Sequence, residues 1–295
     1  MNKKTSATIA LFIMSIIWGL SYIGVQEGLN NGWGPFAILF VRSGIAMIIL
    51  FGITFILKKK YNSRKLFLGA FLCSLSYFAA MALQIYGQRL TTVSNTSFIT
   101  SIYIIMTPVL STIILKRKEK WIIWVSAIIS IIGCFLLNTE IPFSINKDNL
   151  LGNLLVLLCA FFFALQIVFI DIFNKDSDPL QLTAVEMLFT TLFCLIAMSI
   201  VDDFSFHKAG LVPVILVGVF SSALCNFFQI YGQKYVCPST SGIIMGLESV
   251  FGCLSAVIIY QESMAYIQII GAILIVLPAI IIQLPYFKES KEMLK

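Results

Sequence analysis

Four ionisable side chains lie within or near long apolar runs of the sequence: Arg42, Asp171, Glu186 and Glu248. A charge at the centre of a hydrocarbon layer costs about 2.5–3.5 kcal/mol on insertion scales, so it needs a partner, water or a change of protonation state. Glu248 is the deepest of the acids. We expect it either to exchange a proton or to pair with a cationic group of a bound solute. The structural alternative is that it accepts hydrogen bonds from the first half of the chain.

The other three ionisable residues are weaker candidates for chemistry. Arg42 and Glu186 occupy matching positions in the two halves of the sequence, 144 residues apart. They could pair with other charges, and we expect them mainly to hold neighbouring helices together. Asp171 lies close to one end of its run, where water can reach it.

Uncharged polar side chains in these runs recur at the spacing of one helix face. A polar group that faces lipid is costly, so such stripes should face other helices or a water-filled cavity. Interhelical hydrogen bonds, worth about 0.6–2 kcal/mol each, explain any single residue equally well. The stripes taken together favour a cavity: Tyr77, Met81, Gln84 and Gln88; Ser222, Asn226, Gln229 and Gln233; Thr96, Thr100, Tyr103 and Thr107; Ser241, Met245, Glu248 and Ser255.

The candidate cavity combines aromatic, amide and acidic side chains. This mixture suits a zwitterionic or partly apolar solute, and a single deep acid would tolerate an amine. Glu248 is also the candidate for proton coupling. The predicted lining residues are Trp18, Tyr22, Tyr77, Gln84, Asn95, Tyr103, Phe163, Gln166, Asn226, Gln229 and Glu248.

The composition requires these residues to lie in a membrane. The chain has 295 residues and a net charge of +6, and it is 59% hydrophobic and 12% charged. Soluble domains are roughly 45–50% apolar and 25% charged, so a soluble globular protein is excluded. Ten apolar runs come close to the roughly 20 residues that a membrane-spanning helix needs, and none alternates with the period of a strand. Their limits are Ala7–Gln26, Pro35–Leu57, Leu66–Gln88, Val93–Leu115, Trp121–Asn138, Leu150–Phe173, Leu180–Val201, Gly210–Gln233, Thr240–Tyr260 and Ala265–Leu284.

Glycine and proline inside these runs carry their own expectations. Small residues let helices approach closely in a bilayer, and we expect this of Gly19, Gly133, Gly218 and Gly271. Pro108 removes one backbone hydrogen bond and should bend the run Val93–Leu115.

The basic residues predict the orientation. If the N-terminus is cytoplasmic, most of the 20 Lys and Arg residues lie in cytoplasmic segments, while only Arg89, Lys147 and Lys208 lie at outer ends. This asymmetry follows the positive-inside rule and places both termini in the cytoplasm. Lysine clusters at helix ends are a topology signal rather than a nucleic-acid site.

An internal repeat divides the chain. The segment Gln84–Gln88, QIYGQ, recurs as Gln229–Gln233, 145 residues later. Five spans in each copy is an odd number, so the second copy must enter the membrane inverted. Inverted repeats are the usual build of secondary transporters, which bind substrate near the bilayer midplane between the copies. The predicted fold is therefore an all-α integral membrane protein with ten transmembrane helices, formed by two inverted five-helix repeats at 1–142 and 143–295 around a central cavity.

The sequence also resembles a known family along nearly its whole length. Ten spans in two inverted halves, Trp18-Gly19, Ser94–Tyr103 and the stretch from Gly246 to Gly271 resemble the EamA-type transporters of the drug/metabolite transporter superfamily. The chain departs from the family pattern at Ser249, where proline is common, and at Lys116–Glu119, where a Gly-Glu pair is usual. The resemblance implies a secondary carrier in the cytoplasmic membrane that exports amino acids or related metabolites.

Other classes find little support. The single histidine, the lack of paired cysteines and the lack of a glycine-rich phosphate loop argue against a metal site, ATP hydrolysis and any cofactor. No polar cluster at one interface suggests an enzyme. The expected partners are a small-molecule substrate and the lipid bilayer, not nucleic acid. The oligomeric state is open, with a monomer compatible. Uptake or exchange of a nucleobase, vitamin or organic cation, or a channel-like facilitator, remain alternatives.

Overall fold

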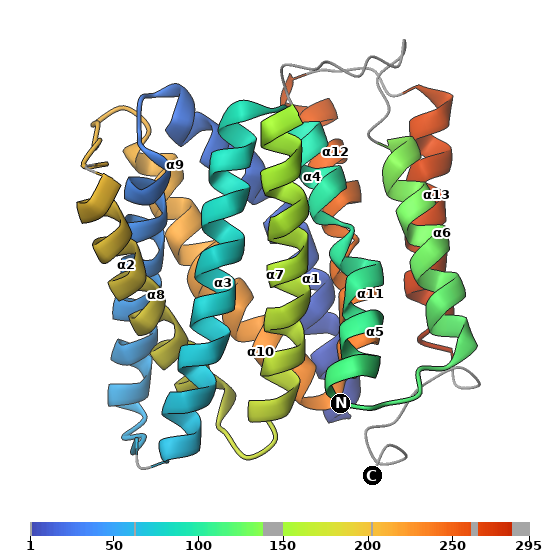
Figure 1. The fold of residues 1–295 in the computed structure, drawn as a ribbon, viewed down its shortest axis with the longest axis horizontal. Coiled ribbons are helices and arrows are strands. Elements are labelled where there is room, and N and C mark those ends of the chain that lie inside the picture. Colours follow the sequence, from blue (N-terminus) through green and yellow to red (C-terminus); the bar gives the residue numbers. More distant parts are fainter. Residues whose placement is uncertain (1, 62, 138–149, 202, 261–264, 285–295) are drawn as a thin grey trace.

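Every regular element that the structure describes is a helix (Figure 1). The computed structural model describes residues 2–61, 63–137, 150–201, 203–260 and 265–284. The expected repeat boundary at 142/143 and the motif residues Gln261 and Glu262 lie outside these ranges. The elements are α1 (Lys3–Asn30), α2 (Pro35–Ile56), α3 (Arg64–Leu90), α4 (Val93–Thr100), α5 (Tyr103–Ile114), α6 (Trp121–Leu137), α7 (Leu150–Phe173), α8 (Pro179–Val201), α9 (Leu211–Leu216), the π-helix η2 (Val217–Cys225), α10 (Asn226–Tyr235), α11 (Pro238–Met245), α12 (Glu248–Tyr260) and α13 (Tyr266–Ile281).

Helix length and apolarity make this a multi-pass membrane protein. Seven helical segments of the described ranges are long and apolar enough to cross a bilayer: α1, α2, α3, Asn95–Ile114, α7, α8 and Leu211–Tyr235. The apolar helices α6 and α13 are shorter. Helix occurs in each of the ten predicted runs. The number of ten membrane crossings and the inversion of the second repeat stay predictions.

Polar side chains fix where several helices begin. The first backbone N–H groups of a helix lack partners inside it, so an acceptor there is stabilising. Ser63 accepts from the Leu66 N–H before α3, and Thr92 accepts from the Asn95 N–H before α4. Asp203 reaches from the end of α8 to accept from the Phe36 N–H of α2 at 2.8 Å. Short loops therefore join the helices with defined geometry.

Two predicted continuous spans are interrupted, which corrects the expectation of regular helices there. The run Val93–Leu115 divides at Ser101 and Ile102 into α4 and α5, and the run Thr240–Tyr260 divides at Gly246 and Leu247 into α11 and α12. The two breaks are 145 residues apart, at equivalent points of the repeat. Pro108 lies several residues after the first break, so it does not cause it. At both points the backbone stays right-handed helical and tightens to i→i−3 hydrogen bonds, so each is a local irregularity of the helix at matching positions of the two halves.

The two halves of the chain are interleaved rather than separate. Figure 1 shows α3 and α7 side by side at the front, α2 and α8 at one edge, and α6 and α13 at the other, and these are tightly packed pairs. α1 runs through the centre against η2, α10, α11 and α12. A Cβ atom added to Gly133 would lie 2.7 Å from the Gly271 carbonyl oxygen. The close approach predicted at Gly19, Gly133, Gly218 and Gly271 is confirmed, because an added Cβ would crowd a neighbouring helix at each.

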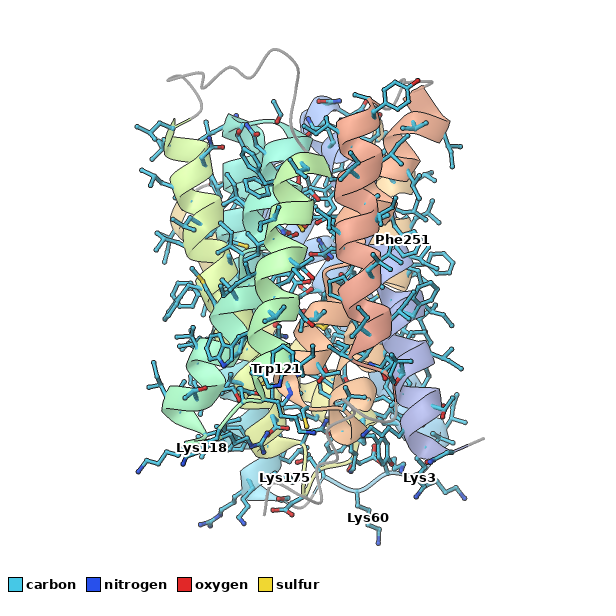
Figure 2. All side chains as sticks on the ribbon, turned by 90° about the vertical axis from the view of Figure 1, so that its right-hand side faces the viewer. Lys3, Lys60, Lys118, Trp121, Lys175 and Phe251 are labelled. Atoms are coloured by element: carbon cyan, nitrogen blue, oxygen red, sulfur yellow. The ribbon has the colours of Figure 1, made fainter. Side chains whose placement is uncertain are left out.

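Basic residues gather at one end of the bundle. Figure 2 shows Lys3, Lys60, Lys118 and Lys175 at the same end, although they come from four distant parts of the chain. This is the distribution that the predicted orientation requires, and that end is the expected cytoplasmic side.

At the basic end, Asp178 is expected to stabilise the start of α8. Its Oδ1 accepts from the N–H groups of Leu180 and Gln181, and its Oδ2 accepts from the Lys59 ammonium at 2.7 Å. Burial alone would raise the pKa of Asp178, but Lys59 and the two N–H groups outweigh it and lower the pKa. We expect Asp178→Ala to reduce the free energy of unfolding by about 1 kcal/mol at neutral pH, as for other helix caps.

The pH dependence has a defined sign. A lowered native pKa means that this stabilisation is present above the ordinary aspartate pKa and is lost as the pH falls through the native value. Thermal unfolding in detergent, measured at neutral and at acidic pH, checks this. Asp176→Ala is the matched control, because Asp176 and its partner Lys65 are 3.9 Å apart and mostly exposed. A deficit in Asp178→Ala that persists unchanged at acidic pH would contradict the assignment.

Candidate functional site

A central pocket lies between α1, α2, α3, α5, α7, η2, α11 and α12. Its cavity has a volume of only about 30 Å³, which leaves room for little more than water. The pocket is therefore narrow in this conformation, and a larger solute requires its walls to move apart. The lining residues are Trp18, Ser21, Tyr22, Val25, Arg42, Tyr77, Met81, Gln84, Gln88, Tyr103, Phe163, Ile167, Ser221, Met245 and Glu248.

The structure brings most of the predicted lining residues together. Trp18, Tyr22, Tyr77, Gln84, Tyr103, Phe163 and Glu248 all face this pocket. The Phe163 ring is central among them, with its centroid 6.4 Å from those of Trp18 and Tyr77 and 6.3 Å from that of Tyr103. Their role in binding stays a prediction.

Four predicted residues lie outside the pocket wall. Asn95 is at the start of α4, where its amide donates to the Thr91 hydroxyl at 3.1 Å. Gln166, Asn226 and Gln229 are fully buried behind the pocket. A helix stripe identifies the face on which these residues lie but not which neighbouring helix covers it. Their role in substrate binding stays a prediction.

Arg42 is a pocket residue that we expected mainly to hold helices together. Its side chain is 3% exposed, and its Nε and Nη2 donate to the hydroxyls of Ser222 and Ser221 at 2.8 and 3.0 Å. Among the described residues no carboxylate lies within ion-pair distance of it. Arg42 does join α2 to η2, but the described groups that accept hydrogen bonds from its guanidinium are two neutral hydroxyls. The feature of the sequence that could have indicated its place in the pocket is a single arginine inside an apolar run.

The π-helix η2 positions the partners of Arg42. A π-helix holds an extra residue per turn and is frequently found at functional sites. Here the wider turns direct both Ser221 and Ser222 toward α2. The Ser221 carbonyl also accepts from the Trp18 indole N–H at 3.2 Å. A regular 3.6-residue period, used to define the stripe from Ser222 to Gln233, could not predict this arrangement.

Glu248 is positioned by the break between α11 and α12. It is the first residue of α12, 3% exposed, where the positive end of the helix dipole favours a carboxylate. Its repeat counterpart Tyr103 is the first residue of α5. The Tyr103 hydroxyl lies beside the Glu248 carboxyl group and interacts with it. Both side chains line the pocket.

Amide and hydroxyl groups close the remaining wall. The Gln84 amide donates to the Tyr22 hydroxyl at 3.3 Å and to the Thr100 hydroxyl at 3.2 Å. The Gln88 amide donates to the Tyr22 carbonyl at 3.3 Å. These bonds hold α1, α3 and α4 together around Tyr22, so the pocket is a connected hydrogen-bonded wall rather than an apolar gap.

The match to a family of known proteins covers both halves of the chain. The model of the EamA-like transporter family matches residues 5–139 and again residues 150–284. The chain belongs to the EamA-like transporter family. It is thus a membrane transporter and not an enzyme. The transporter carries one family unit on each side of the expected repeat boundary.

Relatives of this transporter share the same description. It is 27% identical to an uncharacterized transporter of Archaeoglobus fulgidus over 96% of this chain and 87% of the relative. It is 22% identical to the uncharacterized transporter YcxC of Bacillus subtilis over 98% and 96% of the two chains. A solved crystal structure superposes with a TM-score of 0.80 over 95% of this chain and 96% of the other at 13% identity, which shows a shared fold.

Potential metal ligands do not cluster in the described part of the transporter. Among those residues no group of three or more His, Cys, Asp or Glu side chains is placed to hold a metal ion. The pocket presents one guanidinium, one carboxylate, amides and aromatic rings, groups that can recognise a solute.

Proposed function

We propose that this protein is a secondary carrier of small zwitterionic metabolites, with amino acids as the leading class and export as the favoured direction. The observation that carries the proposal is the charge composition of the pocket. Arg42 and Glu248 both line it, both are buried, and neither forms an ion pair among the described residues. Buried charges are stable when they are paired, and a zwitterion supplies a carboxylate for Arg42 and an ammonium for Glu248.

Helix packing supports an inverted repeat with alternating access. A shift of about 145 residues relates α1 to α7, α2 to α8, α3 to η2 and α10, and α6 to α13. If a two-fold axis relates the halves, the contact between α3 and α7 must be matched by a contact between α10 and α1. Both contacts occur. In the pairs α2–α8 and α6–α13, each helix packs against its own counterpart in the other repeat. A two-fold relation between the halves would produce this pattern, and such carriers work by rocking one unit against the other.

The narrow pocket is consistent with a carrier that must change shape. Room for little more than water at its centre means that solute binds after the surrounding helices move apart. We place the protein in the cytoplasmic membrane with both termini inside, on the basis of the basic end of the bundle.

Counterflow in proteoliposomes tests the function. Vesicles loaded with an unlabelled mixture of amino acids should accumulate radiolabelled amino acids from outside, with saturation and with stimulation by the internal pool. Parallel vesicles loaded with nucleobases or with quaternary ammonium cations test the alternative substrates. Currents that increase linearly with voltage, without counterflow, would instead indicate a channel-like facilitator and reject the carrier.

The same assay defines the role of Glu248. We expect Glu248→Gln to weaken counterflow of amino acids at least tenfold, because the uncharged amide cannot balance a buried ammonium, and tenfold corresponds to about 1.4 kcal/mol. Glu27→Gln is the matched control, since Glu27 lies outside the central pocket. If Glu248→Gln kept full transport with an unchanged pH dependence, Glu248 would bind neither the ammonium nor a transported proton.

A further inference from the structure

A second buried carboxyl group lies behind the pocket, on α8. Glu186 is fully buried where α8 meets α3 and α10, and α7 packs on the same side. It does not line the pocket. Its surroundings are neutral and polar: Gln166 on α7, Gln229 on α10, and Cys73 and Tyr77 on α3.

In the two side-chain hydrogen bonds that lead to Glu186, each donor points toward the carboxyl group. The Gln229 amide donates to Gln166 Oε1 at 3.4 Å, and the Gln166 amide donates to Glu186 Oε1 at 2.8 Å. Glu186 Oε2 has no hydrogen-bond partner among the described residues, and neither has Gln229 Oε1. No Lys, Arg or His of the described chain pairs with Glu186. The carboxyl group therefore receives a single neutral hydrogen bond in a fully buried site.

This environment selects the charge state of Glu186. An ionised carboxylate in a low-dielectric interior is stable only with a cation or several donors, and here it has one amide. A sodium ion would need several oxygen ligands converging on one point, and the described residues provide only one carboxylate there. We propose that Glu186 is a proton-binding site of this transporter, and that binding of its proton favours solute binding at Arg42. The second clause rests on the proposed function.

Tyr77 and Arg42 provide the connection between the two sites. Tyr77 lines the pocket and is within electrostatic range of both Arg42 and Glu186. Its hydroxyl accepts from the Asn226 amide at 3.1 Å, and the same amide donates to the Ser222 carbonyl at 2.8 Å. Ser222 in turn holds Arg42. Hydrogen bonds thus connect Tyr77 on α3 to the residues that hold the guanidinium, and Glu186 on α8 acts on Tyr77 through its charge.

The sign of the coupling follows from competition for Arg42. Arg42 and Glu186 stand at matching positions of α2 and α8, which pack against each other. A protonated Glu186 leaves Arg42 on its serines and available to a solute carboxylate. An ionised Glu186 attracts the guanidinium and lowers its affinity for that carboxylate. The other titratable side chains of the described residues that face this region are Cys73, Tyr77 and Cys194, residue types whose ordinary pKa values lie above physiological pH.

Infrared spectroscopy of the purified protein in lipid tests proton binding without any substrate. The carbonyl stretch of a protonated carboxylic acid should titrate in wild type and in Glu248→Gln, and the component from Glu186 should be missing in Glu186→Gln. Gln166→Leu keeps the carboxyl group but removes its donor, so the titration should move to higher pH. If Glu186→Gln and Gln166→Leu both leave the band unchanged, Glu186 is not a proton site.

Transport measurements test the coupling. Glu186→Gln mimics the protonated state, so it should retain counterflow of a radiolabelled amino acid mixture and lose at least 90% of accumulation driven by a pH gradient. Retained gradient-driven accumulation in this variant would overturn the coupling. Accumulation that responds to a sodium gradient alone would assign the site to sodium and also overturn it. Failure of wild-type counterflow would reject the proposed function, while the infrared titration would still decide the proton site.

Discussion

Replacing Arg42 by alanine is expected to reduce amino acid counterflow at low substrate concentration by about 30-fold or more. Removal of one partner from a buried, hydrogen-bonded charge pair costs about 2–5 kcal/mol, and 2 kcal/mol corresponds to about 30-fold in affinity. Arg42→Lys should recover only part of the loss, because an ammonium cannot bridge Ser221, Ser222 and a solute carboxylate as a planar guanidinium can.

A solute without a carboxylate is the control for the role of Arg42 in binding. An amine that lacks the carboxylate should inhibit counterflow by wild type and by Arg42→Ala with similar potency, since its binding does not use the guanidinium. Arg89→Ala, at the exposed end of α3, should transport normally. Equal loss of affinity for the amine and the amino acid would show that Arg42 only maintains the fold.

Replacing Gly19 by alanine is expected to damage both stability and transport. The added Cβ would lie 2.6 Å from the Glu248 carbonyl oxygen and 2.6 Å from the Gly252 nitrogen. These are backbone atoms, so no side-chain rotation relieves the contact, and α1 must move away from α12. Overpacking of this kind costs about 1–3 kcal/mol. Because Glu248 begins α12, we expect counterflow to fall at least tenfold as well.

A matched glycine separates packing from helix propensity. Gly52 on α2 has no atom within 4 Å of an added Cβ. Gly52→Ala should therefore leave transport unchanged and raise stability by up to about 1 kcal/mol, the helix-propensity gain of alanine over glycine. Melting curves in detergent and counterflow of both variants provide the comparison. Wild-type behaviour of Gly19→Ala would mean that α1 and α12 are not in contact as described.

Parts of the site could be predicted because lipid cannot solvate polar side chains and because those side chains recur with the helical period. Trp18 and Gly19 stand in the segment that resembles the family signature, and both make defined contacts, since the Trp18 indole bonds to η2 and Gly19 packs against the start of α12. Tyr77 and Gln84 lie on a polar helix face that lipid cannot solvate, so they had to face inward. Both do line the pocket.

Other parts of the site required tertiary information. Gln166 and Gln229 were expected in the pocket, but behind it Gln229 donates to Gln166 and Gln166 donates to Glu186. Arg42 was expected mainly to hold helices together, but it lines the pocket. A stripe of residues specifies a direction around one helix axis. Which helix lies in that direction depends on how all helices pack.

Taken by itself, the sequence determined that the chain crosses a membrane, because its 59% hydrophobic composition cannot form a water-solvated surface. It also determined the repeat that relates Gln84–Gln88 to Gln229–Gln233. Only the tertiary structure decided where α4 and α11 end, where η2 replaces a regular helix, and which charges meet in one cavity. Those features depend on backbone irregularities and on contacts between segments far apart in the chain, and local periodicity contains neither.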